Sequence, residues 1–513
     1  MPIELNNIPS DITLPGTYAE FDSTNARSVA SGRNYRGVIY GQKLAAGSAA
    51  ADVAIQIQSK SAAVAAFGAG SILARMVAAF IKQNPNSTLY CIPQADDAAG
   101  VARVVEVDYT AAYATAPTGV GVEQLYIGPD AAYKLAITSA STATTVAAAM
   151  AALVEANDDC PFSATAAAGK LTLTAKNKGI VPNDIQVAYR YYDTDSAATG
   201  TYPTITQKTA GATNPSVAAG IASASNMDMT HVVMPYKDAT NYALMLAEAQ
   251  DRWGPMPSET SLGNGQEDFM VFGAFRGSEA QCTSFKSGRN SEYFVTLALE
   301  PGQTIDGVAY PGTITSDFEA AAIYAAKSIA LCKVVANKPH QNTILVGLRG
   351  APKVCQFAWP VRNRLAKLGL STAKYNASGQ VLLETGITER TLTDDGMATD
   401  AERRIETQFA KSHIRYTTRS TLDSEYPNFR LADDGTAGLP QSVATPKMIK
   451  GTIIALAVNS WVPQGIIENL SNFISTLVVE RSTDNCDTIK FQMFPDLVNV
   501  LVVKAGSINY IVC

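Results

Sequence analysis

The side chains that could carry chemistry are few in this chain and stand far apart. Its three histidines are His231, His340 and His413, and no H-E-x-x-H pair occurs. The sequence also lacks a G-x-S-x-G nucleophile elbow and a phosphate-binding G-x-x-x-x-G-K-[ST] loop. We therefore expect a protein that is not an enzyme, has no catalytic residue and binds no cofactor.

Two pairs of carboxylates, in Asp394-Asp395-Gly396 and Asp433-Asp434-Gly435, are the candidates for a metal site. Calcium takes about six to eight oxygen ligands, usually from one tight loop, and neither loop has the third acidic ligand. Asp-Asp-Gly is also a frequent turn sequence. We therefore interpret both loops as turns and expect no metal.

The cysteines indicate thiols rather than disulfides or a metal site. There are seven of them, widely spaced and without a C-x-x-C pair. An odd number at such spacing is typical of buried or incidental thiols in a reducing compartment.

Length and composition indicate an ordered protein of several domains. The chain has 513 residues and a mass of 54.2 kDa, more than one hydrophobic core usually serves, so we expect about two to four domains. Hydrophobic residues make up 47% of the chain and charged residues 17%, which excludes a mainly disordered protein. The net charge is −6 and there is no long lysine or arginine run, so we expect no direct contact with nucleic acid.

Scattered basic residues offer one possible contact surface. A solvated face is the simpler interpretation, and contact with an acidic protein partner is the alternative. The residues are Lys286, Arg289, Arg362, Arg364 and Lys367.

Neither a signal peptide nor a membrane span is predicted. The N-terminus has no basic segment followed by an apolar one. The longest run of low charge, residues 44–73, still contains Asp52 and Lys60 and is too polar to cross a bilayer. We expect no membrane insertion, and synthesis and assembly in a cytoplasm.

Both ends of the chain are expected to be extended arms. In residues 1–22, Pro9 and Pro15 disfavour a central strand, and residues 497–513 form an apolar, β-rich end. Such arms need a sheet edge elsewhere, so we expect them to make contacts between subunits. The candidate contact residues are Ile12, Leu14, Tyr18, Phe21, Ile508, Tyr510 and Val512.

Between the arms, the spacing of apolar residues predicts a mixed α+β and α/β chain of several domains. Strands alternate with helices in residues 23–95 and again in residues 216–348, which predicts one discontinuous central α/β domain. Residues 96–215 are rich in alanine, threonine, serine and glycine and predict a small inserted α+β outer domain. A C-terminal α+β domain is expected for residues 349–496.

The last third of the chain also contains two predicted helices. The first begins at Thr445-Pro446, and the second covers residues 465–481. The second carries polar positions at Glu468, Asn469 and Asn472, which could make weak, releasable contacts with a partner.

Five segments with distinctive residues follow one another along nearly the whole chain. They are residues 8–26 (IPSDITLPGTYAEFDSTNA), 249–256 (AQDRWGPM), 287–291 (SGRNS), 426–435 (YPNFRLADDG) and 494–499 (FPDLVN). Together they resemble the tail sheath proteins of Mu-like contractile phages. Residues 96–215 lie outside the resemblance, and Phe494 stands where that family has proline.

The resemblance implies a structural subunit of a contractile virion tail. Such a subunit would polymerise as a helical sleeve around the tail tube and contract from a metastable extended state. Contraction would drive the tube through the host envelope for genome ejection. The implied partners are further copies of the chain, the tail tube protein, and baseplate and tail terminator proteins.

The resemblance also bears on the fold and on individual residues. The central domain would have a subtilisin-like topology without catalytic residues, and the terminal arms would add strands to neighbouring subunits. The helix containing Glu468, Asn469 and Asn472 would face the tube.

Three alternatives remain open at this stage. The first is the sheath of a phage-derived bacteriocin or injection machine, which the sequence does not distinguish from a phage tail. The second is a host-binding virion surface protein, favoured by the threonine- and alanine-rich insert. The third is a hydrolase with an unrecognised site.

Overall fold

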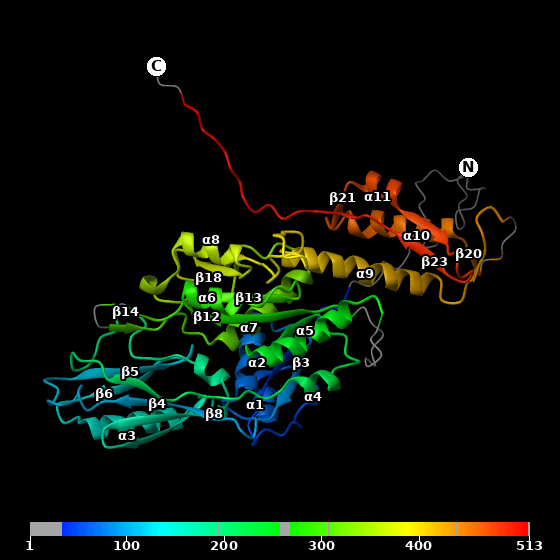
Figure 1. The fold of residues 1–513 in the computed structure, drawn as a ribbon. Helices are drawn as coiled ribbons and strands as arrows, with labels where there is room; N and C mark the ends of the chain where they lie inside the picture. Colours follow the sequence, from blue (N-terminus) through cyan, green and yellow to red (C-terminus); the bar gives the residue numbers. More distant parts are fainter. Residues whose placement is uncertain are drawn as a thin grey trace, which may run out of the picture. The chain divides into compact units, whose positions relative to one another are not determined.

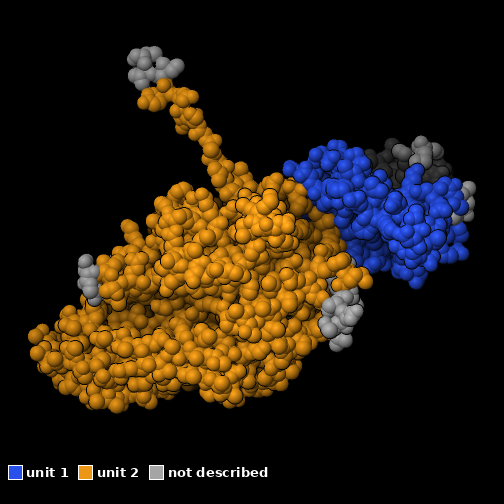
Figure 2. Space-filling model, viewed as in Figure 1, with its two compact units in different colours: residues 1–33, 416–496 blue, residues 34–415, 497–513 orange. Residues whose placement is uncertain are grey.

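The computed structural model describes residues 33–192, 194–256, 267–305, 308–436, 440 and 442–510. The chain divides into two compact units, shown in different colours in Figure 2. The main unit comprises residues 34–415 and 497–513, and the C-terminal unit comprises residues 1–33 and 416–496. The boundary falls inside helix α9 (Ile405–Glu425).

A six-stranded sheet forms the core of the main unit (Figure 1). Its strand order is β13-β12-β11-β1-β3-β2, and neighbouring strands are parallel except for β2 with β3. All residues of β1 and β13 are buried, as in parallel sheets whose two faces are covered. The strands are β1 (Gly37–Gln42), β2 (Ile55–Gln56), β3 (Leu89–Gln94), β11 (His231–Val233), β12 (Met270–Arg276) and β13 (Phe294–Leu299).

Helices α2 (Ile72–Gln83) and α7 (Asp317–Cys332) pack against this sheet and against each other. A Cβ atom at Gly37 would lie 2.9 Å from the Phe80 ring of α2, so glycine allows this helix to approach β1 closely. Nearly every residue of α7 is buried, rather than a single apolar stripe. The contacts of α7 with both the sheet and α2 explain this burial.

The other helices of the main unit follow the expected alternation with strands. For example, α5 begins where the Asp238 carboxylate accepts a hydrogen bond from the Asn241 backbone N–H at 3.0 Å. These helices are α1 (Lys60–Phe67), α4 (Ala218–Ser223), α5 (Ala239–Trp253), α6 (Glu279–Lys286) and α8 (Trp359–Lys367).

The predicted insert contains two antiparallel sheets of its own. One has the order β10-β4-β8-β7 and the other β6-β5-β9, and α3 (Ala143–Glu155) packs against β6, β7 and β8. All of their strands lie within residues 102–209. They are β4 (Ala102–Asp108), β5 (Gly121–Ile127), β6 (Tyr133–Ile137), β7 (Phe162–Ala167), β8 (Lys170–Lys178), β9 (Val187–Ala188) and β10 (Thr204–Thr209).

Residues 349–415 belong to the main unit, although the sequence analysis assigns them to a C-terminal domain. They supply two strands of the sheet β16-β18-β17, and β17 packs against β13 of the central sheet. The two compact units meet between residues 415 and 416, and the expected start of a C-terminal domain at 349 stays a prediction. The strands are β16 (Thr343–Ile344), β17 (Thr372–Tyr375) and β18 (Val381–Thr385), and a separate hairpin joins β14 (Gln303–Ile305) to β15 (Val308–Tyr310).

The C-terminal unit has its own small core around Trp461. This side chain is fully buried, packs edge-on against Phe473, and donates a hydrogen bond from Nε1 to Thr417 Oγ1 at 3.0 Å. Helix α10 (Pro446–Leu456) begins at Thr445-Pro446, as predicted. The remaining elements are β19 (Arg430–Leu431), β20 (Val443–Ala444), β21 (Ile467–Glu468), α11 (Leu470–Thr476), β22 (Val478–Arg481), β23 (Ile489–Gln492) and β24 (Asp496–Leu497).

The mixed α/β class that the sequence predicts is confirmed, with several separate sheets. The subtilisin-like topology and the detailed domain limits stay predictions. Among the helices of the described residues, none combines the length and hydropathy required for a membrane span.

Candidate functional site

An isolated hairpin in the C-terminal unit has two open sheet edges. Strands β22 and β23 are antiparallel, with Val479 opposite Phe491 and Glu480 opposite Lys490. No third strand joins this sheet within the described part of the chain. Val478 is 49% exposed and Phe491 is 43% exposed. An open edge presents unpaired backbone groups to which another chain can add a strand.

Polar contacts fix this hairpin to the rest of its unit. Lys450 of α10 donates from Nζ to the Leu477 carbonyl at 2.7 Å, directly before β22. Arg481, at the end of β22, forms an ion pair with Asp433 at 3.0 Å and donates from Nε to the Cys486 carbonyl at 2.7 Å. These contacts hold the hairpin in a defined position within its unit.

The C-terminal arm is exposed and pairs with no strand among the described residues, although Gln341 Nε2 donates a hydrogen bond to the Leu501 carbonyl at 2.8 Å. Residues 498–510 contain neither a helix nor a strand, and Figure 1 shows them as an extended red trace. Ile508 is 92% exposed and Tyr510 is 83% exposed. Large apolar side chains at this exposure are not buried by the rest of their own chain, as expected for an arm that is covered by another subunit.

Other predicted arm residues fall outside the described residues. These are Ile12, Leu14, Tyr18 and Phe21 of the N-terminal arm, and Val512 of the C-terminal arm. The predicted contacts of both arms stay predictions.

The three predicted tube-facing residues lie together and are exposed. The sequence predicts one helix over residues 465–481, but the structure has a shorter helix, α11, between β21 and β22. Glu468, Asn469 and Asn472 are exposed around its start, whereas Phe473 is fully buried. Asn469 has the left-handed φ of 52° that asparagine tolerates, and this turn separates β21 from α11. Contact of this polar face with a tube stays a prediction.

The structure brings together two histidines that the sequence places far apart. His231 Nε2 lies 3.0 Å from Ser328 Oγ, and Ser328 Oγ lies 2.9 Å from His340 Nε2. On the other side of its ring, His340 Nδ1 lies 3.3 Å from Glu406 Oε1. A serine, a histidine and a carboxylate in this order could suggest a hydrolytic triad.

The surroundings of Ser328 favour a structural role. Ser328, His231 and His340 are fully buried, and Ser328 lies inside α7 rather than on a turn. The cavity lined by Arg75 and the smaller one lined by Phe272 do not include it. The serine hydroxyl has one proton, so it donates to one ring and accepts from the other. We interpret this chain of polar groups as a buried network that ties α7 and β11 to the first turn of α9.

The remaining candidates for chemistry also have structural explanations. Gly396 and Gly435 have positive φ angles of 79° and 87°, as expected for the predicted turns. Asp394 pairs with Arg390 at 2.8 Å, and the described residues contain no cluster of three or more metal-ligating side chains. Five cysteines in the described part of the chain are buried with free thiols, and Cys486 is exposed with a free thiol.

The five basic residues do not form a common free surface. Lys286 is buried and donates to the Arg289 and Glu389 carbonyls, and Arg289 stacks on Tyr242 and Phe285. Arg362 pairs with Glu384, and Arg364 pairs with Glu279. Lys367 is the exposed member for which the described residues give no ion pair.

An open two-stranded sheet and an exposed C-terminal arm, both within the described residues, are features typical of structural proteins whose copies associate by strand addition. The chain is 31% identical to the Mu-like prophage FluMu tail sheath protein of Haemophilus influenzae over 512 residues, which span all of both chains. It belongs to the family of Mu-like phage tail sheath proteins. No model of a known protein family matches it.

Solved structures of other sheath proteins are similar to a lesser degree. A sheath tail protein from Desulfitobacterium hafniense is 12% identical, with a TM-score of 0.48, and 95% of this chain and 97% of that chain are covered. The helical sheath of the anti-feeding prophage in its contracted state is 10% identical, with a TM-score of 0.45, and the covered shares are 97% and 99%. The family assignment rests on the full-length relative from Haemophilus influenzae.

Proposed function

We propose that this tail sheath protein polymerises as a helical sleeve around a tail tube and contracts from a metastable extended state. The full-length similarity to a prophage tail sheath protein is the observation that carries the proposal. Contraction would push the tube through the host envelope for genome ejection. The protein would be assembled in the host cytoplasm, form part of the virion, and contact tube, baseplate and terminator proteins. The central domain would keep a subtilisin-like topology without activity.

We further propose that backbone pairing links the subunits. The arm around Ile508 and Tyr510 is exposed in the single chain, and the β22–β23 hairpin offers open edges. If an arm added as a strand to the hairpin of another copy, the unpaired backbone groups of both segments would form hydrogen bonds. Main-chain hydrogen bonds tolerate changes in the surrounding side-chain contacts, so such links would hold while the subunits reorient.

The purified protein is expected to form helical sleeves in negative-stain micrographs, and assembled extended sheaths should shorten without ATP. Contraction would release conformational energy that the extended lattice already holds, and the sequence has no phosphate-binding loop. Micrographs recorded with and without added ATP check this expectation. Shortening that depends on ATP would contradict it, and a protein that stays dispersed at all concentrations would contradict polymerisation.

Charge reversal at Glu468 is expected to weaken attachment of the sheath to the tube. Glu468 is exposed next to Asn469 and α11, so Glu468→Lys changes the proposed contact without disturbing a buried group. Co-sedimentation of sheath and tube proteins measures the attachment. Asp487→Lys is the matched control, because Asp487 is an exposed acid of the same unit in the β22–β23 loop. Equal attachment of Glu468→Lys and the control would remove α11 from the tube interface.

A further inference from the structure

The insert is joined to the rest of the main unit by charged side chains that are buried or partly buried. We call this boundary the seam: insert residues on one side, and residues of the central sheet and its helices on the other. Besides the exposed Lys60, the side chains of four cations from the central part reach across it to insert residues. They are Arg75, Lys237, Arg276 and Arg349.

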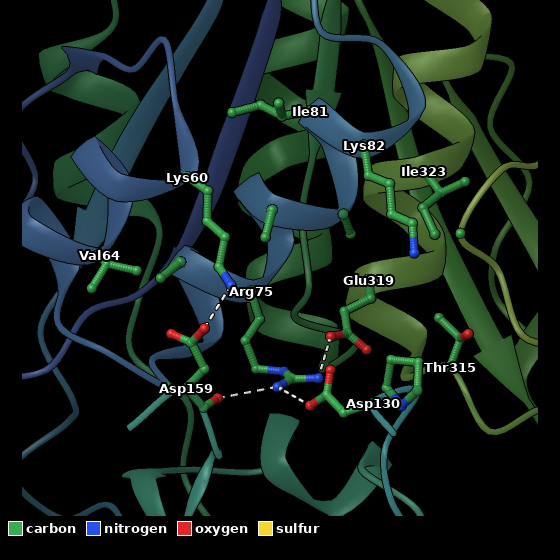
Figure 3. Close-up of a pocket in the computed structure, with 16 residues that line it drawn as sticks. Lys60, Val64, Arg75, Ile81, Lys82, Asp130, Asp159, Thr315, Glu319 and Ile323 are labelled. Atoms are coloured by element: carbon green, nitrogen blue, oxygen red, sulfur yellow. Dashed lines mark hydrogen bonds and ion pairs between the residues drawn. The ribbon is translucent and has the colours of Figure 1, made fainter. Parts of the chain in front are cut away.

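The first charge cluster at the seam is centred on Arg75 of α2 (Figure 3). Its Nη1 atom lies 2.8 Å from Asp130 Oδ2 of the insert, and its Nη2 atom lies 2.8 Å from Glu319 Oε1 of α7. The Arg75 side chain is 8% exposed and that of Glu319 is 5% exposed. Burial raises the pKa of Glu319 even though Arg75 opposes this shift. Arg75 thus joins a carboxylate of the insert to a carboxylate of α7.

The second cluster repeats this arrangement with Lys237. Its Nζ atom lies 2.8 Å from Asp184 Oδ2 of the insert and also pairs with Asp317 of α7. Arg276 donates to the Asp184 carbonyl at 2.7 Å and pairs with Asp317 at 3.2 Å. Burial raises the pKa of Asp317, but Lys237 and Arg276 outweigh that effect and hold the pKa below its ordinary value.

Both central carboxylates, Asp317 and Glu319, stand in the first turn of α7. The two clusters therefore start from the same helical turn, but they contact different residues of the insert, Asp130 and Asp184. Near the first cluster, Arg349 donates to the carbonyls of Pro129 and Asp130 at 2.8 and 2.6 Å.

We propose that the first turn of α7 is a clamp that holds the insert and the central sheet as one rigid body. The clamp consists of Asp317 and Glu319, and it acts through Lys237 and Arg75 on Asp184 and Asp130. If the proposed sheath function holds, the insert then moves with the central sheet when the sheath changes shape.

Breaking a buried ion pair on one side is costly, because the partner keeps its charge without compensation. Without the Asp184 carboxylate, Lys237 keeps one ion-pair partner at the seam, Asp317. Without the Asp130 carboxylate, Arg75 keeps one ion-pair partner there, Glu319. A chain that joins Gln94 directly to Ser216 would remove both insert carboxylates at once. A separate outer domain, as the composition of residues 96–215 predicts, should be removable without loss of the central fold, whereas the clamp predicts that its removal destabilises the central part.

A third ion pair at the same seam provides a matched control. Lys60 and Asp159 lie 2.6 Å apart with side chains 58% and 42% exposed, at the edge of a cavity of about 410 Å³ beside Arg75 (Figure 3). Exposed pairs contribute little to stability because water screens them. Asp130 is 40% exposed, much like Asp159, so the pairs differ in their cations: Arg75 is 8% exposed and Lys237 24%, whereas Lys60 is 58% exposed. Asp159→Asn therefore makes the same chemical change as Asp130→Asn or Asp184→Asn, but removes the partner of an exposed cation.

Hydrogen exchange of the full chain in its unassembled form tests the clamp. Asp130→Asn and Asp184→Asn are expected to speed exchange at the seam by about tenfold or more, because local opening becomes easier. The informative peptides cover residues 180–188 and 234–238, and 72–83 and 127–131. Asp159→Asn should exchange like the wild-type protein, and peptides covering α10 should not change in any variant.

Calorimetry provides a second measurement. The wild-type main unit should unfold with the insert in one transition, and Asp130→Asn/Asp184→Asn should separate an earlier transition of the insert. If the double variant does not fold, hydrogen exchange of the two single variants still tests whether the clamp holds the insert. Unchanged exchange in both single variants, or an equal effect of Asp159→Asn, would overturn the clamp. Because both measurements use unassembled protein, a failure of sleeve formation would leave this result standing.

Discussion

Truncation after Ser507 is expected to give a folded protein that no longer forms sleeves. The removed residues include Ile508 and Tyr510, which are 92% and 83% exposed and so contribute little to the stability of the single chain. Each backbone hydrogen bond of an added strand contributes about 1 kcal/mol net. Loss of about three such bonds weakens association about a hundredfold. Melting temperature and negative-stain microscopy over a range of concentrations measure the two effects separately.

Deletion of residues 1–16 should have the same outcome, because the second arm is expected to make equivalent links. Val503→Ala is the matched control for the truncation after Ser507. Val503 is 75% exposed in the same C-terminal segment, and it is retained when the chain ends at Ser507. Sleeves formed by either truncated protein at normal concentration would show that strand exchange through the arms does not hold the subunits together.

Trp461→Ala is expected to destabilise the C-terminal unit by about 3–5 kcal/mol, since it removes a large, fully buried side chain. The substitution also removes the ring contact of Trp461 with Phe473 and its hydrogen bond to Thr417. Because the β22–β23 hairpin belongs to the same unit, sleeve formation should be lost as well. Urea unfolding measures the stability, and hydrogen exchange of residues 446–481 locates the change.

Trp359→Ala is the comparison that separates burial from the chemistry of tryptophan. Trp359 is 65% exposed at the start of α8, so its removal should change the free energy of unfolding by no more than about 0.5 kcal/mol. If the two variants lose similar stability, the C-terminal unit does not depend on the core around Trp461.

Several elements follow directly from local sequence patterns. The apolar strands of the central sheet, the start of α10 at Thr445-Pro446 and the turns at Gly396 and Gly435 agree with the predictions. Each depends on interactions among neighbouring residues: a side chain that caps a helix, a proline in a first turn, or a glycine with positive φ. The ordered motifs along the chain also sufficed to predict the sheath family, which the full-length relative confirms.

Local patterns were less informative where distant segments meet. Residues 465–481 have helical spacing, but only 470–476 are helical, because the flanking residues form strands with other parts of the chain. Helix α9 shows no break in sequence where the two compact units divide. The basic residues expected on one surface are mostly taken up by internal partners such as Glu384 and Glu279.

The sequence by itself therefore determined the class of protein and most of the described helices and strands. The tertiary structure decided which polar groups meet. Ser328 contacts His231 and His340, which lie 97 and 12 residues away, and Asp317 and Asp184 share Lys237 across the seam. Secondary structure depends on contacts over a few residues, whereas a charge cluster depends on how sheets and helices pack. Its members carry no common spacing that a linear pattern could reveal.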